Sequence, residues 1–211
     1  MLAMLFACAL VFGFMPAAEA MRDQSADRLL ACLNSRAVQL NNALHKAWIN
    51  HTIWTRAYIV SAIADLPDRQ AVLERLLRNQ QDIGDLYKPY YGEAAGNRLA
   101  ALLKEHIVIA GKIVEAAKAG NQAEVEKLDA DWHRNADEIV RFLSSANPNW
   151  QFKTLQDILY THLQLITEVV LNHLKGDWEA DIAATDRNEI HILQLADLLT
   201  EGIVRQFPEK F

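Results

Sequence analysis

The apolar residues recur at spacings of three and four along almost the whole chain after residue 36, and no window alternates as a half-buried strand does. This period is typical of amphipathic helices. About half of the residues are apolar (51%), 23% are charged, and only 8 Gly and 5 Pro are present, which is the composition of a folded globular protein. The sequence therefore predicts an all-α protein.

Helix-breaking residues divide this pattern into six segments. The predicted breaks are Leu66-Pro67-Asp68, Lys88-Pro89-Tyr90-Tyr91-Gly92, Gly120-Asn121, Asn147-Pro148-Asn149 and Gly176-Asp177. They predict helices at about 37–65, 68–86, 122–145, 152–175 and 178–205, and a further helix that follows the break at residues 88–92 and ends at about residue 118. Short connections between long helices favour antiparallel neighbours, so we expect an up-and-down antiparallel bundle of four or five long helices with one short inserted helix.

The first 20 residues resemble a secretory signal. Residues 1–15 carry no charge, and Ala18-Glu19-Ala20 provides small residues at the −3 and −1 positions of a cleavage site. No Lys or Arg precedes the apolar stretch, so an uncleaved membrane anchor is the alternative. We expect an exported protein in which residues 21–211 form one domain and Cys32 is the single cysteine, because Cys8 lies in the signal. A formal net charge of −6 disfavours nucleic acid as a partner.

The histidines fall at one height in the predicted bundle. His51 lies 15 residues before the turn at Leu66, His106 lies 14 before Gly120, and His162 lies 14 from the turn at each end of its helix. At ~1.5 Å per residue, each stands ~20 Å from the helix ends. Two further histidines at this level are His133 and His191.

Helical phase separates these histidines into inward and rim positions. At ~100° per residue, the side chains of His51, His106 and His162 fall on the apolar stripes of their helices, whereas those of His133 and His191 fall beside them. On the last helix we expect Glu189 to face the core, with Asp186 one turn earlier. The inward or bordering polar residues of the fourth helix are Asn135 and Asp137.

Buried imidazoles and a carboxylate at one level need partners, and a metal ion is one. We therefore predict a transition-metal site (Zn, Fe, Mn, Ni or Cu) with His51, His106, His162 and Glu189 as ligands. The expected surrounding or alternative ligands are Asn135, Asp137, His133, Asp186, Thr55 and Tyr58. The competing interpretation is a core network in which Glu189 pairs with one protonated histidine, and Thr55, Tyr58 or Asn135 satisfies the others.

Several known chemistries lack their motifs here. The chain has no Glu-x-x-His, His-Glu-x-x-His, Cys-x-x-Cys, P-loop or Gly-x-Ser-x-Gly sequence, which disfavours di-iron carboxylate bundles, zincins, thiolate zinc sites, nucleotide hydrolases and serine hydrolases. Non-covalent haem held by His106 and His162 remains an alternative. A ligand-sensing or protein-interaction module, with a cleft near Arg56 or the Tyr90 loop, is another. Whether the protein is an enzyme is left open by the sequence.

Four segments resemble a family of small bacterial helical-bundle proteins of uncharacterised activity. These segments are His51-Thr-Ile-Trp54-Thr55-Arg56, Asn135-Ala-Asp137, Tyr160-Thr161-His162-Leu163 and Arg205-Gln206-Phe207-Pro208. The resemblance covers most of the chain after residue 20. It implies a bacterial origin and a bundle fold, but it assigns no activity, ligand or functional residue.

Overall fold

The computed structural model describes residues 35–211, and these form an all-α bundle without a strand. Its elements are α2 (Arg36–Ile63), α3 (Arg69–Lys118), α4 (Gln122–Ala146), α5 (Phe152–Lys175), α6 (Trp178–Gln206) and the 3₁₀ turn η1 (Pro208–Lys210). The predicted fold class is confirmed. The predicted signal segment and both cysteines lie outside the described residues. Within residues 35–211, no helix is long and apolar enough to cross a membrane.

Helix α3 is a hairpin of two arms that meet at Gly92. This glycine has φ 85° and ψ 167°, a conformation that is essentially restricted to glycine, so the chain reverses there. The predicted loop over residues 88–92 is thus shorter than expected, because the helix continues through Pro89 and breaks at one residue. The arms approach closely at Gly84 and Gly96, where a Cβ on Gly84 would lie 2.5 Å from the Gly96 carbonyl oxygen.

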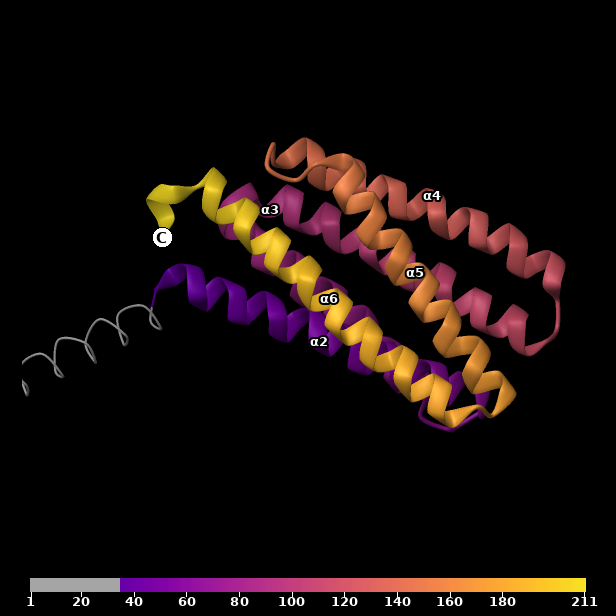
Figure 1. Cartoon of the computed structure of the whole chain (residues 1–211). Helices are drawn as coiled ribbons and strands as arrows, with labels where there is room; N and C mark the ends of the chain where they lie inside the picture. Colours follow the sequence, from indigo (N-terminus) through magenta and orange to yellow (C-terminus); the bar gives the residue numbers. More distant parts are fainter. Residues whose placement is uncertain (1–34) are drawn as a thin grey trace, which may run out of the picture.

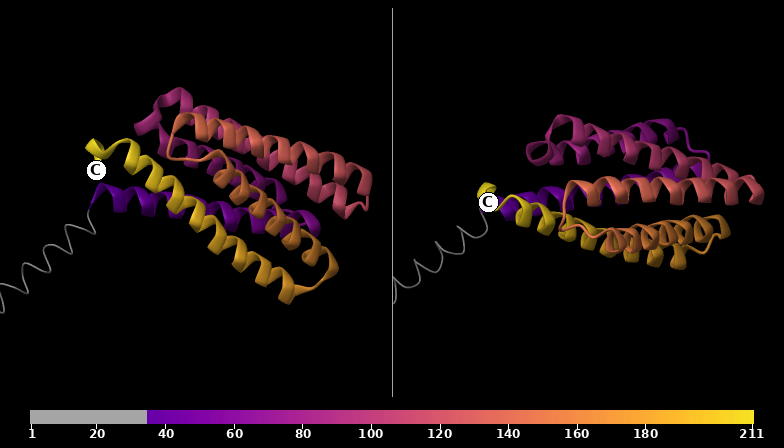
Figure 2. Two further views of the ribbon diagram at one scale, coloured as in Figure 1. Left: turned by 45° about the horizontal axis from the view of Figure 1, so that its top comes forward. Right: turned by 90° about the horizontal axis from the view of Figure 1, so that it is seen from above.

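The helices form an up-and-down bundle (Figure 1). α2 packs against α3 and α6, α3 against α4, α4 against α5, and α5 against α6, which closes the ring. The first arm of α3 is the inserted helix. The amide of Asn79 on this arm donates to the Ala47 carbonyl of α2 (3.0 Å), and in the view from above the arm lies on the outside of the bundle (Figure 2).

Side-chain caps and left-handed residues explain why most helix limits were predictable. Ser35, Asn121 and Asp177 accept hydrogen bonds from the amides three residues later, which begins α2, α4 and α6. Gly120 and Gly176, with φ of 69° and 71°, follow the ends of α3 and α5. Because these signals are local, the sequence locates them without knowledge of the packing.

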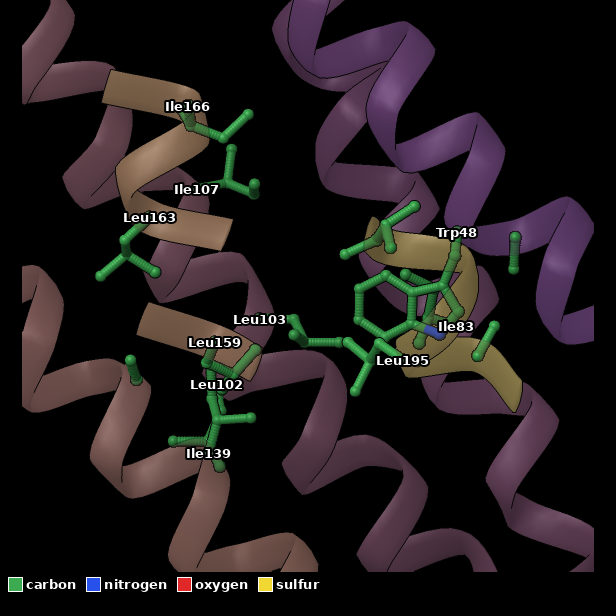
Figure 3. Packing of buried hydrophobic residues seen from close by; sticks show 14 of the residues in the cluster. Trp48, Ile83, Leu102, Leu103, Ile107, Ile139, Leu159, Leu163, Ile166 and Leu195 are labelled. Carbon is green, nitrogen blue, oxygen red and sulfur yellow. The ribbon is translucent and has the colours of Figure 1, made fainter. Parts of the chain in front are cut away.

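The core runs the length of the bundle and draws side chains from all five helices. Figure 3 shows Trp48 of α2, Ile83 of α3 and Leu195 of α6 in one part of it. In another part, Ile139 of α4 and Leu159 of α5 point into the interior (Figure 3). Polar side chains at mid-height interrupt this apolar interior, and they form the candidate site.

Candidate functional site: a buried histidine layer

Three histidines from three helices meet at mid-height of the bundle, as the turn distances predicted. His51 of α2, His106 of the second arm of α3 and His162 of α5 are 2%, 5% and 4% exposed. The ring centres of His51 and His162 are 5.7 Å apart, and those of His106 and His162 are 6.4 Å apart. The prediction that these three side chains face the core is confirmed. We call these three residues the histidine layer.

Each ring of the layer has a neutral amide at its Nδ1 atom. The Nδ1 atoms of His106 and His162 lie 2.8 Å from the Oδ1 atoms of Asn135 and Asn188. A carbonyl oxygen only accepts, so both rings carry their proton on Nδ1 and leave Nε2 with a free electron pair. The Asn135 amide is fixed in this orientation, because its nitrogen donates to the Leu102 carbonyl (3.2 Å).

His51 has the opposite arrangement. The amide nitrogen of Gln80 donates to its Nδ1 atom (3.3 Å) and also to the Leu76 carbonyl (2.8 Å), so this ring carries its proton on Nε2. The Oε1 atom of Gln80 is buried and has no hydrogen-bond partner among residues 35–211. Among these residues, all hydrogen bonds to the three rings are made at Nδ1.

The layer is uncharged at neutral pH. Burial and, to a smaller extent, the neighbouring His162 lower the pKa of His106 to about 3. Burial likewise lowers the pKa of His162 to about 4. The pKa of His51 also falls well below its ordinary value, chiefly through burial and then through His162 and His106. Amide partners supply no negative charge to offset these effects, so all three imidazoles are neutral.

The predicted carboxylate ligand does not reach the layer. Glu189 and Asp186 are both exposed, and the inward position on α6 belongs to Asn188, which is 1% exposed. The predicted phase of α6 was wrong because it followed Ile182, which the structure leaves 56% exposed. In the alternative core network, the role of Asn135 as a histidine partner is confirmed at His106, whereas the pairing of Glu189 with a histidine is wrong because Glu189 is exposed.

The remaining predicted residues surround the layer without joining it. His133 is half-buried and donates to the Asp129 carbonyl (2.9 Å), and His191 is half-buried and bonds to the Ile158 carbonyl (2.8 Å), so both rim assignments hold. Asp137 faces α5, where it accepts hydrogen bonds from Gln156 and Tyr160. Two residues on α2, Thr55 and Tyr58, are buried one and two turns beyond His51.

A second buried polar cluster lies nearer the Gly176 end of the bundle. The carboxylate of Asp181, which is fully buried, accepts at Oδ2 from Nη2 of Arg56 (2.7 Å) and from Nδ1 of His173 (2.8 Å). His173 is 8% exposed, so this histidine is buried as well. We call Arg56, His173 and Asp181 the ion cluster. A cavity of about 10 Å³, bordered by Arg56 and Asn188, lies between this cluster and the layer.

Sequence reasoning missed two residues of the histidine layer's surroundings, Gln80 and Asn188. The signal for Gln80 was available, because it lies 14 residues after the turn at Leu66 and hence at the height of His51. Asn188 had no such signal, since its identification depends on the rotation of α6, which the apolar pattern misplaced.

Among residues 35–211, no three His, Cys, Asp or Glu side chains form a ready-made metal-binding group. The histidine layer nevertheless offers three imidazoles as donors, and in two of them, His106 and His162, the Nε2 atom is unprotonated. Comparison of the chain with family models, with curated proteins and with solved structures gave no match, so the residues themselves carry the functional argument.

Proposed function

We propose that the protein binds one transition-metal ion in the histidine layer, through the Nε2 atoms of His106 and His162 with His51 as the third ligand. The observation that carries the proposal is the pair of Nδ1 atoms bonded to the oxygens of Asn135 and Asn188. Ligating histidines characteristically donate their second N–H to an oxygen, which fixes the tautomer and the ring orientation.

The ring spacing is compatible with shared ligation. A metal–nitrogen bond of ~2.1 Å places the ion ~3.2 Å from each ring centre, so two rings bound to one ion have centres ~5 Å apart at a tetrahedral angle and at most ~6.4 Å apart in linear coordination. The His51–His162 separation of 5.7 Å lies inside this range, and the His106–His162 separation of 6.4 Å lies at its linear limit, so binding of all three rings to one ion requires His106 and His162 to move closer together. Because the rings are neutral at pH 7, no proton has to leave an imidazolium before an ion binds.

His51 needs a change of tautomer to take part. Its Nε2 atom is freed when the proton moves to Nδ1, and this proton then requires an acceptor. The Oε1 atom of Gln80, which is buried without a partner among the described residues, provides one if the amide rotates. Binding of the third ligand is thus coupled to loss of the hydrogen bond from Gln80 to Leu76.

The donor set favours certain metals among those expected. Imidazole without carboxylate suits Cu, Zn, Ni and Fe better than Mn, which prefers oxygen ligands. The layer also holds no negative charge to offset the ion, and burying one positive charge costs less than burying two. We therefore expect copper, as Cu(I), to bind more tightly than Zn(II).

Haem binding receives less support. Axial ligation requires the imidazoles to border a pocket that holds the porphyrin. None of the three histidines lines any of four cavities found within residues 35–211. Export of the protein stays a prediction from the first 20 residues.

The test is metal content per chain after chelation and reloading with Cu(I), Zn(II), Ni(II) or Fe(II). We expect about one ion per chain, and at least a tenfold loss of affinity in His106→Gln and in His162→Gln. His133→Gln is the matched control, because this histidine lies at the same height but on the rim. Equal affinity in the His106 and His133 variants, or no stoichiometric binding of any of the four ions, would contradict the proposal.

A further inference from the structure

A second candidate site lies one helical turn from the histidine layer. A cavity of about 70 Å³ is enclosed by α2, both arms of α3, α4 and α5. Thr55, Ala110 and Ile166 line the cavity. Each of them follows a histidine of the layer by four residues, on a helix that runs toward the end of the bundle that contains Gly120. The cavity therefore lies above the layer, toward the Gly120 end, and the layer's residues are not among its walls.

The walls are almost wholly apolar and carry no charged side chain. A charged occupant would lose its hydration without compensation, so the cavity selects for a neutral molecule. Dry apolar cavities of ~150 Å³ hold a benzene ring. At about half that volume, this cavity fits a compact molecule of roughly three or four non-hydrogen atoms.

Two side chains in the walls have polar atoms that lack a partner. Nε1 of Trp132 and Oγ1 of Thr55 are buried and form no hydrogen bond within residues 35–211. Trp132 is 2% exposed and Thr55 is 9% exposed, so solvent does not satisfy them either. The indole N–H can only donate and the hydroxyl can donate, so both are suited to an acceptor atom on a bound molecule.

We propose that this cavity binds a small neutral molecule with a compact hydrocarbon part and one oxygen acceptor, such as a short-chain ketone or alcohol. The hydrocarbon part packs against residues such as Ile107 and Ile166, and the oxygen accepts from Trp132 and Thr55. Trp132 also packs on His106, with ring centres 5.1 Å apart, so an occupant borders the histidine layer. The inference does not depend on metal binding.

The test uses acetone as the probe and 2-methylpropene as the matched hydrocarbon of equal size, with xenon as a probe of the apolar space alone. Binding to the full chain is followed by the indole N–H signals in ¹H–¹⁵N spectra, with Trp132 assigned from Trp132→Phe. We expect acetone to bind with a Kd on the order of 1 mM and to move the Trp132 signal.

Thr55→Val is expected to weaken acetone binding about fivefold and to leave xenon binding unchanged, because it removes the hydroxyl and keeps the shape. Ala110→Leu, which fills the cavity, should abolish binding of both probes. Ala101→Leu adds the same atoms to an exposed position on the same arm and should affect neither.

Ala117→Leu serves as the second filling variant if Ala110→Leu fails to fold. Binding of acetone that survives cavity filling would overturn the proposal. So would acetone binding no tighter than that of 2-methylpropene.

Discussion

The histidine layer and the ion cluster bury histidines to a similar extent but surround them differently. In the layer, three imidazoles face amides, and burial lowers each pKa. In the ion cluster, His173 shares the carboxylate of Asp181 with Arg56. The partner at Nδ1, and not burial alone, therefore decides which interactions a buried histidine can form. Amides leave a ring neutral and able to offer an electron pair, whereas the carboxylate of Asp181 links His173 to the guanidinium of Arg56.

The largest expected effect is acid unfolding driven by the layer. Each of its histidines binds a proton near pH 6.5 when unfolded. In the folded protein His106 and His162 bind one only near pH 3 and pH 4, and burial also holds the pKa of His51 well below its ordinary value, so the unfolded state holds more protons at mildly acidic pH. Stability is complete above about pH 6.5 and falls as the pH is lowered, by roughly 4 kcal/mol per pH unit for three such groups. Urea unfolding between pH 7.5 and 5 measures this slope.

Two single variants control this prediction, one at a histidine of the layer and one at a histidine on the rim. His106→Gln should remove about one proton from the pH dependence of the free energy of unfolding, whereas His133→Gln should change the slope least. A slope that is the same in all three proteins would show that the layer does not drive acid unfolding.

The next largest effect is expected from breaking the ion cluster. Asp181→Ala leaves the partly buried guanidinium of Arg56 without its carboxylate and should lower the free energy of unfolding by about 3 kcal/mol at pH 7. Asp181→Asn retains an acceptor oxygen and should cost less, which makes the cluster resemble the layer. Asp186→Ala, on the exposed face of the same helix, should stay within about 0.5 kcal/mol of the parent protein in urea unfolding. Equal losses in the Asp181 and Asp186 variants would contradict a structural role for the cluster.

The reverse exchange places a carboxylate in the layer. Asn135→Asp brings a negative charge to Nδ1 of His106 and should raise the pKa of this ring from about 3 by about two units. Titration of the imidazole signals by NMR measures the change, and His51, which faces Gln80, serves as the internal reference. An unchanged pKa of His106 would show that burial alone, and not the partner at Nδ1, sets the protonation of this ring.

The smallest effect concerns the aromatic neighbours. His106 and His173 each have a tryptophan ring centre 5.1 Å away, Trp132 and Trp178, but Trp178 is 57% exposed. Trp178→Ala should therefore cost only about 1 kcal/mol in thermal or urea unfolding. A loss as large as that of Asp181→Ala would show that the tryptophan, and not the carboxylate, holds His173 in place.

Most of the fold was predictable because its signals are local. The capping residues Ser35, Asn121 and Asp177 and the left-handed Gly120 and Gly176 fix helix ends from within a few residues. The exception is the break in α3. Pro89 and two tyrosines suggested a loop, but the helix continues to Gly92, where contacts between the two arms at Gly84 and Gly96 support a one-residue reversal.

The candidate site was predictable in height but only partly in composition. Counting residues from turns placed His51, His106 and His162 together, because rise per residue is constant in a helix. The buried face predicted for α6 was wrong, because Ile182 is exposed and the polar residue Asn188 is buried. A buried polar residue is stabilised by its hydrogen-bond partner on another helix, and apolar periodicity contains no record of that partner.

The sequence by itself determined the all-α architecture, the order and approximate ends of the helices, and the common level of three histidines. Tertiary structure alone decided that Gln80, Asn135 and Asn188 are the partners of these rings, that Glu189 faces outward, and that Thr55 and Trp132 meet at one cavity. The physical reason is the range of each interaction. Helix formation depends on neighbours along the chain, whereas the choice of hydrogen-bond partner depends on how two distant helices are rotated against each other.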